Sequence, residues 1–218
     1  FVSQTPDYIL PGTSLHLQER LGLPKSCACF DINQGCAGYV YGMSLISGFL
    51  SSTKLKKGLL LVGDTITKFI SPRDKSLVPI FSDCGTATAL SYNENAKPMF
   101  FNISSEGKDY SAIIVEESGS RKRSNEKTAD NKNAEYKLPY LSMKGLEVFN
   151  FSLTKVVPNV EDLLLKARCD KNEIDYFIFH QANKLILDSL KTKLAIAEYK
   201  APSSLKDFGN TSCATIPL

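Results

Sequence analysis

The chain has 218 residues and a mass of 24.0 kDa, a length that suits one large domain or two small ones. With 43% hydrophobic and 22% charged residues, the composition excludes a globally disordered protein. The formal charge of +3 comes from residues 120–137, which hold six basic and three acidic side chains and leave twenty of each elsewhere. Because the rest of the chain is neutral, its charge gives no indication of a nucleic-acid partner.

Six cysteines are present, but none forms a C-x-x-C pair, so we expect reduced thiols, no metal site and no bound cofactor. The N-terminus lacks the basic and long apolar segments of a signal peptide, and no stretch approaches the roughly eighteen apolar residues of a membrane span. These features predict a cytoplasmic protein. The chain begins without Met and stops within the apolar run 216–218, which is typical of a fragment.

The elements of the first half are predicted mainly from short apolar runs. Thr13 and Ser14 can cap a short helix that ends at Leu21. Residues 36–50 are apolar nearly all round, which is typical of a buried helix. We also expect strands at 26–32, 58–62, 86–92, 100–103 and 112–115.

Residues 120–137 contain too few apolar side chains to fold alone and are predicted to form a mobile surface loop. This loop would divide the chain into an N-terminal part, 1–119, and a C-terminal part, 138–218. In the C-terminal part we expect a helical segment over 142–166 kinked at Pro158, a strand at 174–179, a helix at 182–194 and a loop at 203–211. Alternating strands and helices predict an α/β fold with a largely parallel sheet.

Cys36 is the cysteine whose surroundings indicate chemistry. It lies in the first turn of the predicted helix 36–50, among Gly35, Ala37 and Gly38. A helix N-terminus favours the thiolate, and small neighbours leave room for a substrate carbonyl. The alternative is a buried structural cysteine, as we expect for Cys27, Cys29 and Cys169.

Histidine is scarce, which narrows the search for a base. His180 follows the predicted strand 174–179 and precedes a helix, so it should lie at the sheet edge where α/β proteins assemble sites. The alternative is a structural histidine at a strand end. His16 is expected to be a packing or surface residue.

Two polar residues lie in predicted turns. Asn210 follows Gly209, and the alternative to a functional role is an ordinary turn or helix-cap residue. Asp83 precedes Cys84 and is predicted to be a structural carboxylate that binds backbone amides.

Together, a Cys nucleophile, a neutral His and an Asn amide suit decarboxylative condensation. The thiolate of Cys36 can accept an acyl group as a thioester. His180 and Asn210 can donate hydrogen bonds to the thioester oxygen of a malonyl-type substrate, and these bonds stabilise the enolate that forms as carbon dioxide leaves.

Five collinear segments resemble the β-ketoacyl-acyl carrier protein synthase III family: DINQGCAGYVYGM, FSDCGTATAL, MKGLEVFNF, FHQANKLILDSL and DFGNTSCATIPL. The resemblance implies the thiolase fold, two related α/β halves in a layered αβαβα sandwich, and a homodimer. It also implies that Cys36 is the acyl-accepting nucleophile and that His180 and Asn210 are the decarboxylation residues. Acyl-CoA and malonyl-acyl carrier protein would be the substrates, in fatty acid or related biosynthesis.

The resemblance extends to two lysines. Lys75 falls near the position of a family Arg that contacts the nucleotide of coenzyme A, while the family's nucleotide-stacking Trp has no counterpart. Lys184, Lys191 and Lys193, on the helix after HQAN, could bind the acidic carrier or could simply form a solvated helix face.

The resemblance also leaves departures and alternatives. Family members extend beyond this chain at both ends, so the αβαβα sandwich should be incomplete, and a glycine-rich strand that completes the acyl oxyanion hole should be absent. The alternatives are a non-decarboxylating acyltransferase of the same fold and a non-catalytic carrier-binding fragment.

Overall fold

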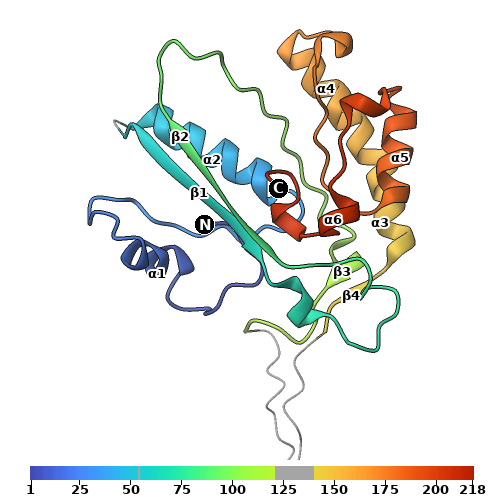
Figure 1. Cartoon of the computed structure of the whole chain (residues 1–218), viewed down its shortest axis with the longest axis horizontal. Helices are drawn as coiled ribbons and strands as arrows, with labels where there is room; N and C mark the ends of the chain where they lie inside the picture. Colours follow the sequence, from blue (N-terminus) through green and yellow to red (C-terminus); the bar gives the residue numbers. More distant parts are fainter. Residues whose placement is uncertain (54, 121–139) are drawn as a thin grey trace, which may run out of the picture.

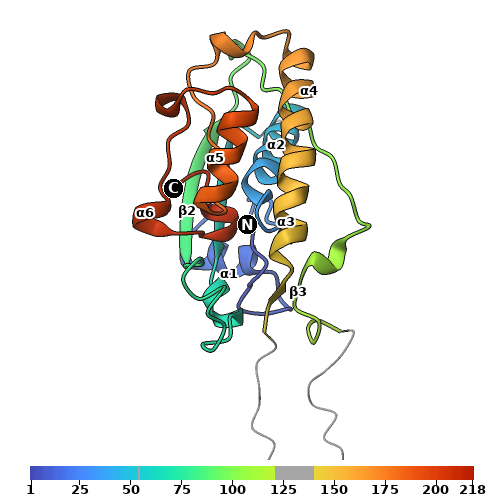
Figure 2. The same ribbon diagram turned by 90° about the vertical axis from the view of Figure 1, so that its right-hand side faces the viewer.

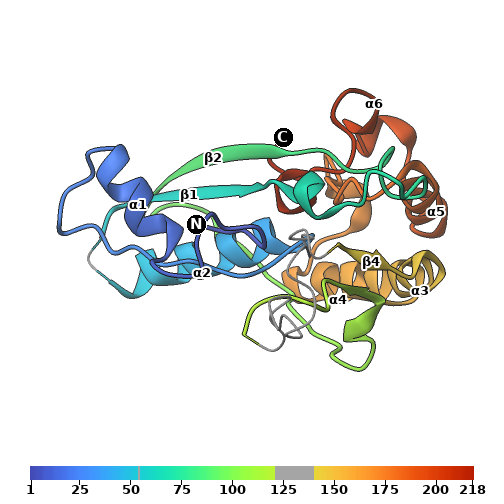
Figure 3. The same ribbon diagram turned by 90° about the horizontal axis from the view of Figure 1, so that it is seen from below.

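The computed structural model describes residues 1–53, 55–120 and 140–218, which form two adjoining groups of elements (Figure 1). The first group contains α1 (Thr13–Arg20), α2 (Gly38–Ser52), β1 (Lys57–Asp64) and β2 (Cys84–Ser91). The second contains β3 (Ile113–Ile114), β4 (Ser142–Met143), α3 (Gly145–Phe151), α4 (Val157–Ala167), α5 (Lys184–Lys193) and α6 (Leu205–Phe208). Seen from below, α1 lies at one end of the molecule, and α3, α5 and α6 lie at the other (Figure 3). No helix in the described ranges is long and apolar enough to cross a bilayer.

The first group is built on the hairpin of β1 and β2. The two strands pair antiparallel from Lys57 opposite Ser91 to Asp64 opposite Cys84. Helix α2 covers one face of this hairpin (Figure 3). The buried core contains Val2, Leu60, Val62 and Cys213, with Tyr39, Met43 and Ile46 of α2 packed against it. Residues from both ends of the chain therefore share one core.

We expected a largely parallel sheet, but both ladders in the described residues are antiparallel, so this expectation was wrong. Parallel pairing occurs there only as isolated bridges. Val2 bridges Ile32 on one side and Val62 on the other, both in parallel. The Val2 N–H donates to the Leu61 carbonyl at 2.9 Å, and the Gly63 N–H donates to the Val2 carbonyl at 3.1 Å. The N-terminal residues thus act as a very short strand between two extended segments.

Three predicted strands do not form ladders in the described residues: 26–32, 100–103 and 174–179. Ile32 keeps only the bridge to Val2, and Phe177 donates one backbone bond to Lys200 at 2.7 Å. Cys27 and Ile178 are exposed rather than buried. An apolar run has strand propensity, but a strand also needs a neighbouring backbone to pair with. The sequence of the run does not show whether such a neighbour is present.

The start of α1 is stabilised by a residue from another segment. Thr13 is the first helical residue, and neither Thr13 nor Ser14 caps the helix with its own side chain. The Asp31 carboxylate accepts hydrogen bonds from the backbone N–H groups of both residues, at 2.5 and 2.8 Å. A carboxylate at this position satisfies the free N–H groups and interacts favourably with the helix dipole.

Helices α3 and α4 form one continuous helical column beside α5 (Figure 2). A π-helical turn, Ser152–Val156, joins the two helices, and Pro158 lies at the start of α4. Proline cannot donate the regular backbone bond to the preceding turn, and a π turn accommodates this loss without ending the helix. The expected kink is therefore a local widening of the helix.

The predicted loop 120–137 lies, apart from its first residue, outside the described residues.

Candidate active site

Cys36 lies in the turn that leads into α2, two residues before the first residue of the helix. The turn rests against the core through Gly38, where an added Cβ would lie 2.7 Å from Val2 Cγ1 and 3.0 Å from Cys213 Cβ. A glycine is therefore required for this close approach. The Cys36 residue is itself exposed.

His180 is held by one short hydrogen bond. Its Nδ1 atom lies 2.6 Å from the Thr215 hydroxyl, which belongs to the C-terminal segment after the 3₁₀ turn Ser212–Ala214. Thr215 is only 2% exposed, so the bond is shielded from water. The other ring nitrogen, Nε2, is buried and has no hydrogen-bond partner among the described residues.

Cys36 and His180 shift each other's ionisation. Close packing around the sulfur raises the pKa of Cys36, but the charge of His180 and hydrogen bonding outweigh this effect and lower the pKa overall. Burial lowers the pKa of His180, while the Cys36 thiolate outweighs burial and raises it overall. Because Nε2 has no formed hydrogen bond, we attribute the coupling mainly to attraction between charges. Both shifts ease the transfer of the Cys36 proton to His180.

Asn210 is buried and fixed on several sides. Its backbone pairs with Ile80 and Ser82, with its N–H donating to Ile80 at 2.9 Å and its carbonyl accepting from Ser82 at 3.0 Å. Its side-chain oxygen accepts from the Ser212 N–H at 2.9 Å, and its side-chain nitrogen donates to the Ala182 carbonyl at 3.3 Å. The amide has two hydrogens, so one remains available to another acceptor.

The structure brings Cys36, His180 and Asn210 together through the C-terminal segment 210–215. Asn210 binds Ala182, two residues after His180, and Thr215 binds His180 itself. Cys213 lies against Gly38, at the turn of Cys36. These contacts join three segments that are far apart in the sequence.

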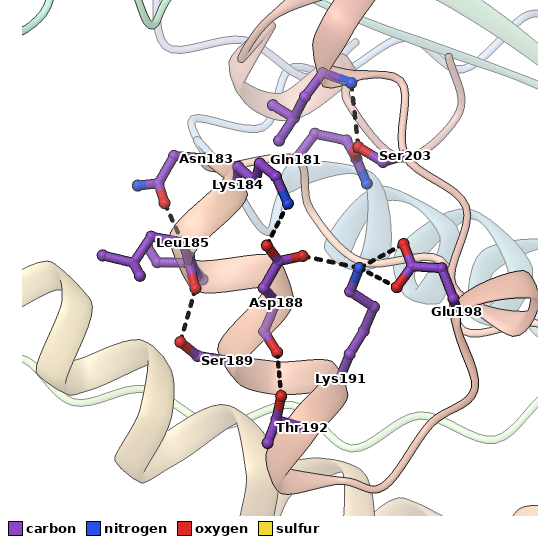
Figure 4. Close-up of polar contacts among 12 residues, drawn as sticks. Gln181, Asn183, Lys184, Leu185, Asp188, Ser189, Lys191, Thr192, Glu198 and Ser203 are labelled. Atoms are coloured by element: carbon purple, nitrogen blue, oxygen red, sulfur yellow. Dashed lines mark hydrogen bonds and ion pairs between the residues drawn. The ribbon is translucent and has the colours of Figure 1, made fainter.

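Gln181 secures the segment that contains His180. Its side chain is 2% exposed and donates to the Phe179 carbonyl at 2.8 Å. Its oxygen accepts from the Ser203 hydroxyl at 2.9 Å and from the Ser204 N–H at 3.1 Å (Figure 4). Asn183 then caps α5 by accepting from the Ile186 N–H. In HQAN, Gln181 and Asn183 are therefore structural, a role that our sequence interpretation did not assign to them.

Behind the site lies a buried carboxylate that the sequence interpretation missed. Asp64 is 3% exposed, and its Oδ1 atom accepts from the Ser3 hydroxyl, the Gln4 N–H and both donors of Thr5. Its Oδ2 atom accepts from the Cys213 thiol at 3.2 Å. A lone Asp at the end of the apolar run 58–62 was the available signal.

The remaining predicted residues lie elsewhere. Lys75 lies on an exposed turn and makes no hydrogen bond or ion pair within the described ranges. Lys184, on α5, has an 84% exposed side chain that pairs with Asp188 (Figure 4). Lys191 is only 11% exposed and binds both Asp188 and Glu198. Asp83 binds the backbone N–H and hydroxyl of Thr67, as predicted for a structural carboxylate.

A groove of about 470 Å³ lies between α5 and the segment 198–209. Ala182, Asn183 and Lys184 line it, but Cys36 and His180 do not, so it is a neighbour of the site rather than the site itself. Among the residues that the structure describes, no three His, Cys, Asp or Glu side chains gather in a group that could hold a metal ion.

Comparison with known proteins gives the family. The family model described as 3-oxoacyl-[acyl-carrier-protein (ACP)] synthase III matches residues 30–107, and its C-terminal counterpart matches residues 164–218. A putative 3-oxoacyl-[acyl-carrier-protein] synthase 3 of Campylobacter jejuni is 31% identical over 99% of this chain and 62% of that protein. A β-ketoacyl-[acyl-carrier-protein] synthase III of Streptococcus pneumoniae is 28% identical over 98% of this chain and 64% of that protein.

Comparison with solved structures gives the same family as the sequence comparisons. The 3-oxoacyl-(acyl-carrier protein) synthase from Burkholderia xenovorans superposes with a TM-score of 0.87 and 41% identity, over 100% of this chain and 62% of that one. The chain spans 62% and 64% of the length of the two curated relatives above. Its fold is an incomplete form of the thiolase-like α/β fold of these structures. The chain belongs to the 3-oxoacyl-[acyl-carrier-protein] synthase III family.

Proposed function

We propose that the protein is a β-ketoacyl-acyl carrier protein synthase of type III, in which Cys36 is acylated by acyl-CoA and then condensed with malonyl-acyl carrier protein. The observation that carries this proposal is that segment 210–215 contacts both His180 and the turn of Cys36 and supplies Asn210. The lowered pKa of Cys36 and the raised pKa of His180 agree with this arrangement. A nucleophile with a lowered pKa beside a group that can take its proton suits acyl transfer. The family relationship supports the same reaction class.

In the first half-reaction, the Cys36 proton moves to His180 and the thiolate attacks the carbonyl carbon of the acyl-CoA thioester. The bond between that carbon and the CoA sulfur breaks, and the departing CoA thiolate takes the proton from His180. The N-terminus of α2 favours negative charge both on the sulfur and on the oxygen of the tetrahedral intermediate.

In the second half-reaction, His180 Nε2–H and the free hydrogen of Asn210 donate to the thioester oxygen of the malonyl substrate. The bond to the carboxylate breaks, carbon dioxide leaves, and the electron pair forms an enolate on that oxygen. The α-carbon then attacks the acyl group on Cys36 and releases the thiolate. A fixed, buried Asn210 suits this step because its donor needs no reorganisation.

The partners follow from the same proposal. The acidic acyl carrier would approach the exposed Lys184, and Lys75 would contact the nucleotide of coenzyme A. We also propose a cytoplasmic homodimer, with residues 1–119 and 138–218 belonging to the two thiolase-like halves. The buried position of Asn210 favours condensation over transfer to an alcohol or amine, since that transfer forms no enolate.

The test is intact-mass measurement of the protein after incubation with a panel of acyl-CoAs. We expect one acyl group, located on Cys36 by peptide mapping, and no adduct on the Cys36→Ser variant. Cys84→Ser is the matched control and should acylate normally, since Cys84 lies on β2 outside the site. No adduct on wild-type protein with any acyl-CoA would disprove the proposal.

The roles of the other two residues are tested by separating the half-reactions. His180→Ala and Asn210→Ala should still acquire an acyl group, with slower acylation for His180→Ala, but both should lose decarboxylation by about a hundredfold or more. Carbon dioxide release from malonyl-acyl carrier protein measures this step. If Asn210→Ala abolished acylation outright, its assignment to the second half-reaction would be wrong.

A further inference from the structure

We infer that Thr215 is a positioning residue whose hydroxyl controls which nitrogen of His180 carries a proton. The inference rests on the proposed function, because it concerns how His180 serves Cys36. The observation behind it is the short contact of 2.6 Å between Thr215 Oγ1 and His180 Nδ1, made by a hydroxyl that is 2% exposed. Because water is excluded, Nδ1 depends on this hydroxyl for its hydrogen bond within the described part of the chain.

The Thr215 hydroxyl can accept a hydrogen bond from His180. Thr215 Oγ1 lies 3.3 Å from the Ser212 carbonyl, which can only accept a hydrogen bond. With its proton directed to Ser212, the hydroxyl oxygen accepts a hydrogen bond from Nδ1–H. This orientation stabilises the imidazolium, and in the neutral ring it leaves Nε2 free to take the Cys36 proton. An unpartnered Nε2 is less costly as a bare acceptor than as a buried N–H group.

The same hydroxyl can also act as a donor. After CoA has left, bulk water can take the ring proton from Nδ1 and return one to Nε2. Rotation about the Thr215 Cβ–O bond then directs the hydroxyl proton to the bare Nδ1, and this hydrogen bond holds the tautomer with hydrogen on Nε2. That is the form needed to donate to the thioester oxygen in the second half-reaction. A serine or threonine hydroxyl has this freedom, whereas a backbone N–H or carbonyl would fix one tautomer only.

The position of Thr215 is set by the C-terminal turn rather than by His180. Ser212 has a positive φ of 55°, and Asn210 holds its N–H at 2.9 Å. Asn210 and Thr215 therefore contact the two sides of the His180 segment from a single rigid turn. The other titratable groups around the pair are Asp64 and Cys213, which adjoin Cys36.

The chain provides a matched control in the same turn. Thr211 is 1% exposed, and its hydroxyl is buried without a hydrogen-bond partner among the described residues. Thr211→Val and Thr215→Val remove the same group from equally buried positions of one segment. Only Thr215→Val removes a contact with His180, so any effect of general repacking should appear in both variants.

The experiment is the rate of Cys36 alkylation by iodoacetamide as a function of pH, followed by peptide mass to separate Cys36 from the other five cysteines. We expect Thr215→Val to raise the apparent pKa of Cys36, so that the curve of alkylation rate against pH moves to higher pH by about one unit. Thr215→Ser and Thr211→Val should match wild type. Thr215→Ala gives the same test if the valine variant does not fold. Carbon dioxide release should fall in Thr215→Val and be restored in Thr215→Ser.

Two outcomes overturn the inference in distinguishable ways. If wild type shows a low apparent pKa that His180→Ala raises but Thr215→Val and Thr215→Ala do not, Thr215 has no such role and the proposed function stands. If wild type already has an ordinary thiol pKa that His180→Ala leaves unchanged, both the inference and the proposed Cys36–His180 pair are wrong.

Discussion

The pKa values of Cys36 and Cys213 shift in opposite directions, although Cys213 lies against Gly38 in the turn that contains Cys36. The pKa of Cys36 is lowered because His180 outweighs the effect of close packing around the sulfur. Burial and the neighbouring Asp64 raise the pKa of Cys213 far above its usual range. At neutral pH, Cys213 is therefore a protonated donor to a carboxylate, while Cys36 is the thiol that can react. The two pKa shifts differ in direction because Cys36 is near the cation of His180, whereas Cys213 is near the carboxylate of Asp64.

This difference predicts the pH dependence of Cys36. A lowered pKa means that the thiolate persists as the pH falls below the ordinary thiol value of about 8.5 and is lost only at the lowered pKa. In His180→Ala the packing around the sulfur remains while the cation is removed, so the pKa should rise above that ordinary value. Thiolate absorbance near 240 nm during a pH titration, with Cys36→Ser subtracted, measures the shift. An unchanged titration would contradict the coupling.

Of the residues at the site, Cys36, His180 and Asn210 could be predicted because each lies in a short motif with a recognisable neighbour. Thr215 and Asp64 could not be predicted in the same way. Their partners, His180 and Cys213, are 35 and 149 positions away, and no local pattern states such a contact. For Asn210, the sequence suggested a candidate role but not the bond to Ala182 that holds its side chain beside the His180 segment.

At the scale of elements, α5 has two kinds of lysine on one helix. Lys191 is held between Asp188 and Glu198 and is mostly covered. Lys184, on the first turn, has a largely exposed side chain that pairs with Asp188 alone (Figure 4). A cation that already has two carboxylate partners attracts an incoming acidic surface less than one that is largely exposed. Of the three lysines on this helix, Lys184 and the exposed Lys193 therefore remain the candidates for binding an acidic carrier.

We predict that Lys184→Glu raises the KM for malonyl-acyl carrier protein by about fivefold at low salt, with kcat and the rate of acylation by acyl-CoA nearly unchanged. The effect should shrink as the salt concentration rises, because exposed charges are screened. Lys166→Glu, on α4, serves as a charge-matched control. An equal increase in KM for both variants would point to net charge rather than to a docking position on α5.

The elements also show which parts of the fold a sequence can indicate. The run 58–62 and the segment 182–194 correspond to β1 and α5, since apolar periodicity and the cap residue Asn183 are local properties. The segments 26–32 and 174–179 have the same kind of pattern but form no ladder in the described residues. Pairing decides between a strand and an extended segment, and pairing depends on distant backbone.

At the scale of the whole molecule, Asp64 joins the two ends of the chain. Ser3, Gln4 and Thr5 bind one of its oxygens, and Cys213 binds the other. The C-terminal turn that contains Cys213 also contains Asn210 and leads to Thr215. The carboxylate therefore supports the site indirectly, because it fixes the turn on which those side chains depend.

We expect Asp64→Asn to lower the free energy of unfolding by about 3 kcal/mol, since an amide nitrogen cannot accept hydrogen bonds and the buried donors lose their charged partner. Asp83→Asn should cost much less, because Asp83 is exposed and binds Thr67 alone. Urea denaturation followed by circular dichroism gives both values. Equal losses would show that Asp64 has no special role in joining the two ends.

The contact between Val2 and Cys213 spans 211 positions, and it has a consequence for how the protein is made. During translation, the Cys36 turn leaves the ribosome long before the segment that brings Asn210 and Thr215 to it. In a nascent chain, therefore, Cys36 is present before His180 is held in place and before the core around Val2 and Cys213 has formed. Contacts of such long range also form slowly, because a large loop must close first. The contacts around the Cys36 thiol can therefore form only after segment 210–215 has been synthesised.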